Sequence, residues 1–252
     1  MIGLFAFSVL LIKEMRWRDY DSNDEGILSE EKIEELQKEN KREQVISYKT
    51  ARLVDTINTI YIIPVSHKTL NEEEDIVLNG LLSASGSEYN YEPDFERRYS
   101  KYVYGDYNNL IVYNKKENTT QKLLNDRANF KDYREEYFND DILLLFKVAE
   151  KDTYKDGVIN LNDFKSLCIY SFEKEKLEKI TLENMDVVDY QFFYGTKELI
   201  VRFGVDKNND GRYTEFNEPS IIKKYNLDTQ KLTDIIDPTL NNELQKTLEG
   251  TK

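Results

Sequence analysis

A strand, turn, strand unit that recurs along the chain is the feature that most constrains the fold. It reads NLIVYNKKENTTQKLL at 109–124, SLCIYSFEKEKLEKI at 166–180 and SIIKKYNLDTQKLTDI at 220–235. The central tyrosines of the three units, Tyr113, Tyr170 and Tyr225, are 57 and 55 residues apart. This period is slightly longer than that of common propeller blades, and it predicts a series of similar small antiparallel sheets.

The pattern between and around these units also favours strands. Apolar residues alternate with other residues in several runs after residue 45, as in ELIVRFGV, where Leu199, Val201, Phe203 and Val205 share one face. The chain has 18 tyrosines and one tryptophan, a composition that favours strands over a helical bundle. With 252 residues, 39% of them hydrophobic, it can bury a sizeable core.

The three units resemble the TolB-like β-propeller repeat, whose blades contain a hairpin of the form xIxxYxxxxxxxxxL. The resemblance covers roughly residues 105–236. It implies a mostly β fold, an antiparallel propeller-like repeat of three to four small sheets. Closed propellers generally have at least four blades. Either residues 45–68 form another blade, or the sheets pack without closing.

An acidic loop follows the strand that ends at Val205. Oxygen-bearing side chains occupy its first, third and fifth positions: Asp206, Asn208 and Asp210. Calcium prefers six to eight oxygen ligands, which a short loop can supply from alternate positions. The loop resembles the EF-hand and dockerin loops: Gly211 provides the sharp turn, and the backbone carbonyl of Arg212 is the next expected ligand. These families place a carboxylate at position twelve; here Asn217 stands there and Glu218 follows, so the closing ligand stays open.

A second loop of this kind, DTYKDGVINLND, occupies residues 152–163. Its expected ligands are Asp152, Asp156, the carbonyl of Val158, Asn160 and Asp163. Tyr154 stands at the third position and cannot chelate through a carboxylate. The alternative is a hairpin turn that uses Asp, Asn and Gly for their backbone conformations. Two such loops at equivalent positions of the repeat favour calcium. Strands, not helices, flank both, so we expect an ion that braces the structure.

The sequence divides into four parts. Residues 1–18 form an apolar segment with a basic flank, 19–44 an acidic turn and polar helical spacer, 45–236 the β-repeat domain with an insertion at 70–101, and 237–252 a tail. Ser29 is positioned to cap a helix running to about Gln44. The stretch DSNDEGILSEEK, residues 21–32, imitates a calcium loop, but Lys32 replaces the closing carboxylate, so we expect a turn and a helix cap.

The uncharged run at residues 2–12 suggests a membrane tether or an export signal. As a helix it would span about 16 Å, less than the bilayer core of about 30 Å. Basic and aromatic residues that suit a membrane interface follow it, namely Lys13, Arg16, Trp17 and Arg18. The alternative is a hydrophobic segment packed on the domain. We therefore expect location in the cell envelope, anchored or exported, with a cytoplasmic location as the alternative.

Composition and motifs limit the classes of function that this sequence predicts. A net charge of −13 argues against nucleic-acid binding. The sequence contains no serine elbow, phosphate-binding glycine loop or histidine cluster, and Cys168 lies in an apolar run typical of a buried strand. We expect a non-catalytic calcium-binding β-repeat protein that acts as a structural or protein-interaction module with an unknown protein partner. The alternatives are a hydrolase on a propeller-like scaffold, with His67 as a base, and a calcium-responsive sensor.

Overall fold

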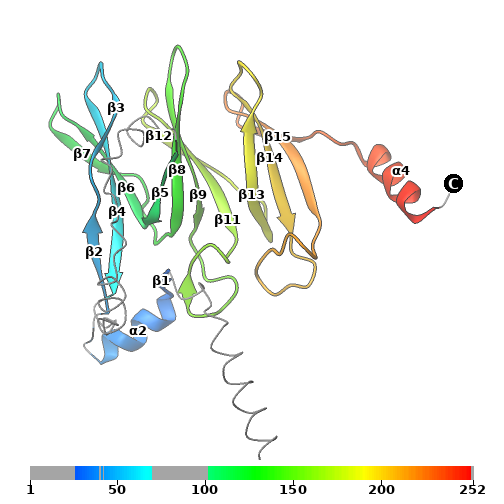
Figure 1. Ribbon diagram of the computed structural model, residues 1–252, viewed down its shortest axis with the longest axis horizontal. Coiled ribbons are helices and arrows are strands. Elements are labelled where there is room, and N and C mark those ends of the chain that lie inside the picture. Colours follow the sequence, from blue (N-terminus) through cyan, green and yellow to red (C-terminus); the bar gives the residue numbers. More distant parts are fainter. Residues whose placement is uncertain (1–25, 40, 42, 70–101, 251–252) are drawn as a thin grey trace, which may run out of the picture.

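The computed structural model describes residues 26–39, 41, 43–69 and 102–250. Within these residues, antiparallel strands form three sheets and one two-stranded ribbon, and two helices accompany them (Figure 1). The expectation of a mostly β protein built from antiparallel sheets is confirmed. The apolar run at residues 2–12 and the insertion at 70–101 lie outside the described residues.

The first sheet contains both the first repeat unit and the strands that precede it. Its members are β2 (Gln44–Tyr48), β3 (Arg52–Asp55), β4 (Ile60–Thr69), β6 (Asn109–Asn114) and β7 (Thr119–Lys122). They pair in the order β2-β4-β6-β7; β2 pairs with one half of β4, and β3 pairs with its other half. Residues 45–68 therefore complete the first sheet and do not form a further blade.

The second and third sheets contain the other two units. The second has the order β12-β11-β9-β8-β5, made of β5 (Tyr102–Tyr107), β8 (Phe130–Tyr137), β9 (Ile142–Ala149), β11 (Lys165–Ser171) and β12 (Lys176–Ile180). The third follows chain order with β13 (Met185–Phe192), β14 (Glu198–Val205), β15 (Ser220–Asn226) and β16 (Lys231–Asp234). The ribbon pairs β1 (Ile27–Leu28) with β10 (Val158–Ile159).

The three units have the same register. Each central tyrosine lies opposite the residue seven positions later in its hairpin, in the pairs Tyr113–Thr120, Tyr170–Leu177 and Tyr225–Leu232. The residue five positions after each tyrosine has a positive φ, which is 55° at Asn118, 49° at Glu175 and 55° at Gln230. The sequence repeat is therefore a structural repeat, with the same turn in each sheet.

Two apolar layers hold the three sheets face to face. One layer, between the first and second sheets, includes Ile62, Leu110, Phe130, Phe146 and Cys168. The other, between the second and third sheets, includes Leu145, Ile169, Leu199, Val201 and Phe203. The second sheet is thus covered on both faces. The predicted apolar face of β14 is confirmed, and Cys168 is buried, which raises the pKa of its thiol to about 12.

Helix α2 (Glu30–Lys38) begins where the sequence predicts and ends earlier. The Ser29 hydroxyl oxygen accepts a hydrogen bond from the Lys32 amide at 3.4 Å. The helix ends at Lys38, so the expectation that it reaches Gln44 was wrong. Gln44 is the first residue of β2. Its side-chain oxygen accepts a hydrogen bond from the Leu28 amide at 3.1 Å, and its side-chain nitrogen donates to the Gly26 carbonyl at 3.0 Å. No residue of α2 is buried, so packing does not favour a longer helix.

The C-terminal part of the chain contains a helix that we did not expect from the sequence. Helix α4 (Pro238–Glu249) follows Asp237, whose carboxylate accepts hydrogen bonds from the amides of Thr239 and Leu240. Gly250 ends it with a left-handed φ of 72°. These are standard start and stop signals. None of the helices in the described ranges is long and apolar enough to cross a membrane.

Substitution of Phe203 tests the layer between the second and third sheets. Phe203→Ala should lower the free energy of unfolding by about 3–5 kcal/mol, because the side chain is 0% exposed and leaves a cavity. Phe216→Ala is the matched control, since that side chain is 94% exposed, and it should change stability by less than about 0.5 kcal/mol. Urea denaturation measures both. Equal losses would contradict the layered core.

Candidate metal-binding loops

The two predicted loops occupy equivalent places in successive repeats. Each connects the second and third strands of its four-stranded unit, β9 to β11 in one sheet and β14 to β15 in the next. Both emerge at the same end of the stacked sheets (Figure 1). Repeats that share a strand order therefore bring the two acidic segments together.

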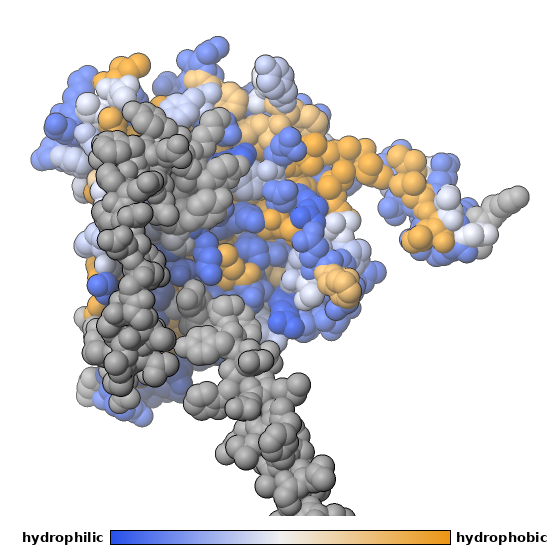
Figure 2. Space-filling view, viewed as in Figure 1, coloured by the Kyte–Doolittle hydropathy of each residue, from blue (hydrophilic) through white to orange (hydrophobic). Residues whose placement is uncertain are grey.

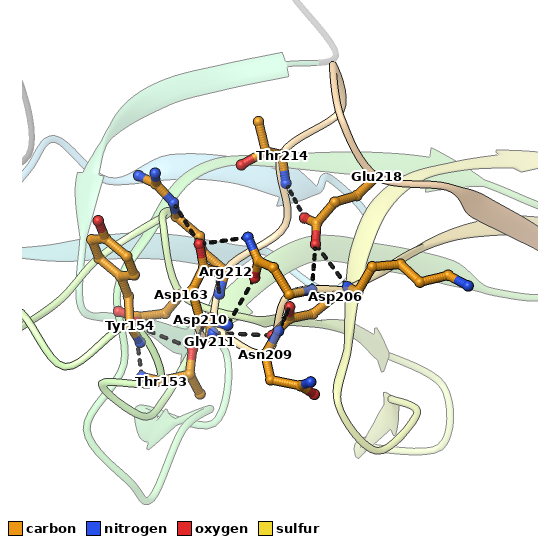
Figure 3. Close-up of polar contacts among 12 residues, drawn as sticks. Thr153, Tyr154, Asp163, Asp206, Asn209, Asp210, Gly211, Arg212, Thr214 and Glu218 are labelled. Atoms are coloured by element: carbon orange, nitrogen blue, oxygen red, sulfur yellow. Dashed lines mark hydrogen bonds and ion pairs between the residues drawn. The ribbon is translucent and has the colours of Figure 1, made fainter.

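The loop after β14 is held by hydrogen bonds from its own backbone to its acidic side chains (Figure 3). The Asp206 carboxylate accepts from the Asn209 amide at 2.6 Å and the Gly211 amide at 3.0 Å. The Asp210 carboxylate accepts from the Arg212 amide at 3.1 Å. The Asn208 side chain accepts from the Asp210 amide and donates to the Asp210 carboxylate. Gly211 has a φ of +88°, as a sharp turn at position six requires.

The loop after β9 repeats this scheme. Asp152 accepts from the amides of Asp156, at 3.2 Å, and Gly157, at 2.9 Å. Asp156 accepts from the Val158 amide at 3.1 Å, and Gly157 has a φ of +94°. Asn160 accepts from the amide two residues later at 2.8 Å. In both loops the first acid binds the amide of the glycine, and the fifth residue binds the amide of the seventh.

One carboxylate closes each loop from the same direction. In the loop after β9 it is Asp163, which accepts from the amides of the second, third and ninth loop residues: Thr153, Tyr154 and Asn160. In the loop after β14 it is Glu218, which accepts from the corresponding amides of Lys207, Asn208 and Thr214. Glu218 is the structural equivalent of Asp163, whereas the side chain of Asn217 is exposed.

The two loops also touch each other. The Thr153 hydroxyl donates to the Gly211 carbonyl at 2.6 Å, and Asp163 and Arg212 form an isolated antiparallel bridge. The Arg212 guanidinium carbon lies 4.4 Å from the centroid of the Tyr154 ring (Figure 3), a cation–π contact. Tyr154, which cannot chelate at position three, thus joins the loops. The role of Thr153 carries no signal in the sequence, because it depends on a contact between repeats.

The loop after β9 binds the segment before helix α2 as well. β1 pairs with β10 through Ile27 opposite Ile159, and the Ser29 amide donates to the Gly157 carbonyl at 2.8 Å. Ile27, Ala149 and Ile159 form a small buried cluster. The expected helix cap at Ser29 is confirmed, whereas residues 21–25, the acidic start of DSNDEGILSEEK, lie outside the described residues.

The pKa values of the two closing carboxylates are shifted in opposite directions from their ordinary values. Asp163 is 1% exposed, and burial raises its pKa above the ordinary value of 3.8, although the three amides oppose this shift. Hydrogen bonds, first from the Thr214 amide, lower the pKa of Glu218 below its ordinary value of 4.5. The same amide geometry therefore leaves Asp163 easier to protonate than Glu218.

The donor chemistry of the loops suits a hard cation, since carboxylate and amide oxygens are the ligands that calcium prefers. A carboxylate oxygen that accepts one amide proton keeps a second lone pair. The acidic side chains are nevertheless held by amides: within the described part of the chain, no three His, Cys, Asp or Glu side chains lie close enough to hold a metal ion. Binding of calcium would therefore require the carboxylates to turn toward a common centre.

The side chain of His67, the candidate base of the hydrolase alternative, contacts a side chain that is itself hydrogen-bonded to the backbone. It lies on β4, and its Nδ1 is 3.0 Å from the Asn108 side-chain oxygen. Asn108 in turn donates to the Ala128 carbonyl at 3.3 Å. These bonds connect the first sheet to the segment just before β8.

Comparisons with family models, with curated proteins and with solved structures gave no match.

Two glycine substitutions separate backbone strain from contact between the loops. Gly157→Ala should cost about 1–2 kcal/mol, because φ is positive but the space around an added Cβ is open. Gly211→Ala has similar strain and also places Cβ 1.9 Å from the Thr153 carbonyl oxygen, so it should cost about 1–3 kcal/mol more. Chemical denaturation of both variants measures the difference. Equal costs would mean that the loops do not touch.

The opposite pKa shifts predict an order of protonation. The folded-state pKa of Asp163 exceeds its unfolded value, so stability from this group increases as pH falls from the folded pKa toward 3.8. For Glu218 the folded pKa is the lower one, so its stabilisation is present above 4.5 and is lost as pH falls through the folded pKa. In an NMR titration with EDTA, the amides of Thr153 and Tyr154 should shift at a higher pH than that of Thr214. The reverse order would refute the assignment.

Proposed function

We propose that this chain is a non-catalytic calcium-binding β-repeat protein that uses the ion structurally and acts by binding another protein. The observation that carries the proposal is that two acidic loops, 152–163 and 206–218, share one hydrogen-bond scheme at equivalent positions of successive repeats. In each, acidic side chains at the first, fifth and closing positions lie around a glycine turn. An ordinary turn does not need acids at both its start and its close.

The expected ligands come from both loops. They are Asp206, Asn208, Asp210, Glu218 and the carbonyl of Arg212 in one, and Asp152, Asp156, Asn160, Asp163 and the carbonyl of Val158 in the other. A bound cation would offset the repulsion among the carboxylates of one loop, and the bridge between the loops would carry this stabilisation to the neighbouring sheet. The ion thus braces a rigid scaffold, as suits loops flanked by strands.

We further propose that the three sheets form an open, propeller-like arc of TolB-like repeats. The shared register of the tyrosines and the face-to-face packing of successive sheets support this arrangement. The uncharged sequence at residues 2–12 supports tethering to a membrane or export. A rigid set of sheets behind a tether presents its loops to a protein partner.

Calcium should stabilise the protein against unfolding. At a hundredfold excess of calcium over its dissociation constant, binding to the folded state alone adds about 2.7 kcal/mol per site. Thermal unfolding should therefore shift upward with calcium and return with EDTA, and isothermal titration should give two equivalents. Asp210→Ala should remove one equivalent.

The control for this experiment is Asp228→Ala, an exposed acid in the turn between β15 and β16 that lies outside both loops. It should leave both equivalents and the thermal shift intact. Absence of calcium binding at millimolar concentration, or equal effects of the two substitutions, would exclude the proposed sites. Magnesium at the same concentration distinguishes specific binding from general screening of the acidic surface.

A further inference from the structure

Helix α4 exposes an apolar stripe. Leu240, Leu244 and Leu248 recur every four residues on one side of it and are 41%, 57% and 82% exposed, and none of its residues is buried. Figure 2 shows apolar residues along α4 and along the segment that leads to it. An isolated helix of this length is only marginally stable in water, so we expect another apolar surface to cover the stripe.

The outer face of the first sheet is a second apolar surface. Alternation places Ile62 and Leu110 toward the second sheet and their neighbours on the opposite side. The apolar residues of this outer face are Ile46, Tyr48, Leu53, Tyr61, Ile63, Val65, Ile111 and Tyr113, and its polar ones include His67, Thr120 and Lys122. Ile46, Tyr48 and Leu53 are 66%, 60% and 41% exposed, and most of the other apolar residues are half-buried. Large apolar side chains gathered on one exposed face mark an interaction surface.

These two surfaces cannot meet within one chain. The first sheet and α4 lie at opposite ends of the stack, with the second and third sheets between them (Figure 1). Stacked sheets are about 10 Å apart, so the outer face of the first sheet is more than about 20 Å from the third sheet. The connection from β16 to α4 is Ile235–Asp237, and three extended residues span at most about 11 Å.

We propose that α4 of one copy docks its leucine stripe on the outer face of the first sheet of a second copy. A helix stripe on a sheet face is a standard layer packing. The charges also agree: Glu243 flanks the stripe, and Lys122 lies opposite Ile111 on the sheet face, while the adjoining turn has two lysines, Lys115 and Lys116, against one acid, Glu117. The contact joins different surfaces of the two copies, so it is head-to-tail and leaves one free surface at each end.

Two other occupants fit the helix less well. If the α4 stripes of two copies paired only with each other, six leucines, three from each copy, would be covered, but the apolar outer face of the first sheet would stay exposed in both copies. Helices that lie on membranes are rich in Lys and Arg on the polar face, whereas α4 has Lys246 and two glutamates. The head-to-tail contact gives the interaction role proposed above a definite partner, a second copy of this chain. It does not depend on calcium.

Analytical ultracentrifugation of the full chain tests the contact. The mean mass should rise with protein concentration, equally in calcium and in EDTA, so a failure of the calcium sites would not affect this result. Leu244→Lys on the helix and Tyr48→Lys on the sheet should each weaken association roughly 30-fold, as for a central interface residue. Asn242→Lys, on the side of α4 away from the leucines, is the matched control and should associate as the wild type does. Circular dichroism verifies folding, since all three positions are exposed.

Mixing the two weakened variants gives the sharpest test. Leu244→Lys keeps an intact sheet face and Tyr48→Lys keeps an intact helix, so together they should form a one-to-one dimer that grows no further, because the two remaining surfaces carry like charges. A monomeric wild type at every concentration, undiminished association of Leu244→Lys, or a mixture that stays monomeric would overturn the proposal. If the wild type is monomeric and vesicles of anionic lipid bind it through α4, the stripe is a membrane contact.

Discussion

Burial of both faces of the second sheet is the constraint on which the rest of the structure depends. Strand β9 reads ILLLFKVA, a nearly continuous apolar run, because alternate residues enter different layers. Leu144 and Phe146 face the first sheet, while Leu143 and Leu145 face the third. A repeat of this kind cannot bury its apolar surface alone. Stacking therefore both stabilises each unit and fixes the position of the loops at its ends.

A buried ion pair adds specificity to the layer between the first two sheets. Arg52 of β3 lies 3.2 Å from the Glu135 carboxylate of β8, and Glu135 is 1% exposed. Burial raises the pKa of Glu135, and the Arg52 charge opposes this shift. The Tyr137 hydroxyl also donates to the Val54 carbonyl across the same layer. Buried charges rarely increase stability over apolar packing, but an unpaired one is costly, so the pair favours one alignment of the two sheets.

Alternating and repeating apolar residues made most strands predictable, and departures from that pattern explain the elements that sequence reasoning missed. Strand β8 reads FKDYREEY, and from this sequence alone Glu135 would be expected on the surface. It is buried in the structure, where Arg52 lies beside it and pairs with its charge. Helix α4 buries nothing, so its apolar spacing alone gave a weak signal. The spacing of the acidic loops located them but left the closing residue open between Asn217 and Glu218, because backbone geometry, not position count, determines that the Glu218 carboxylate reaches the amides.

In each repeat, the additional residues lie in one connection between strands. In all three sheets the hairpins on either side are short, whereas the link between the second and third strands is long: 70–108, 150–164 and 206–219. The last two are the acidic loops, and the first carries β5, which leaves its own repeat and pairs with β8 of the next sheet. Each long link therefore bonds to a neighbouring element: β5 to the second sheet, the loop after β9 to β1, and the loop after β14 to the loop before it. The long links thus join successive sheets at two places: β5 is a strand of the second sheet, and the two acidic loops bond to each other between the second and third sheets.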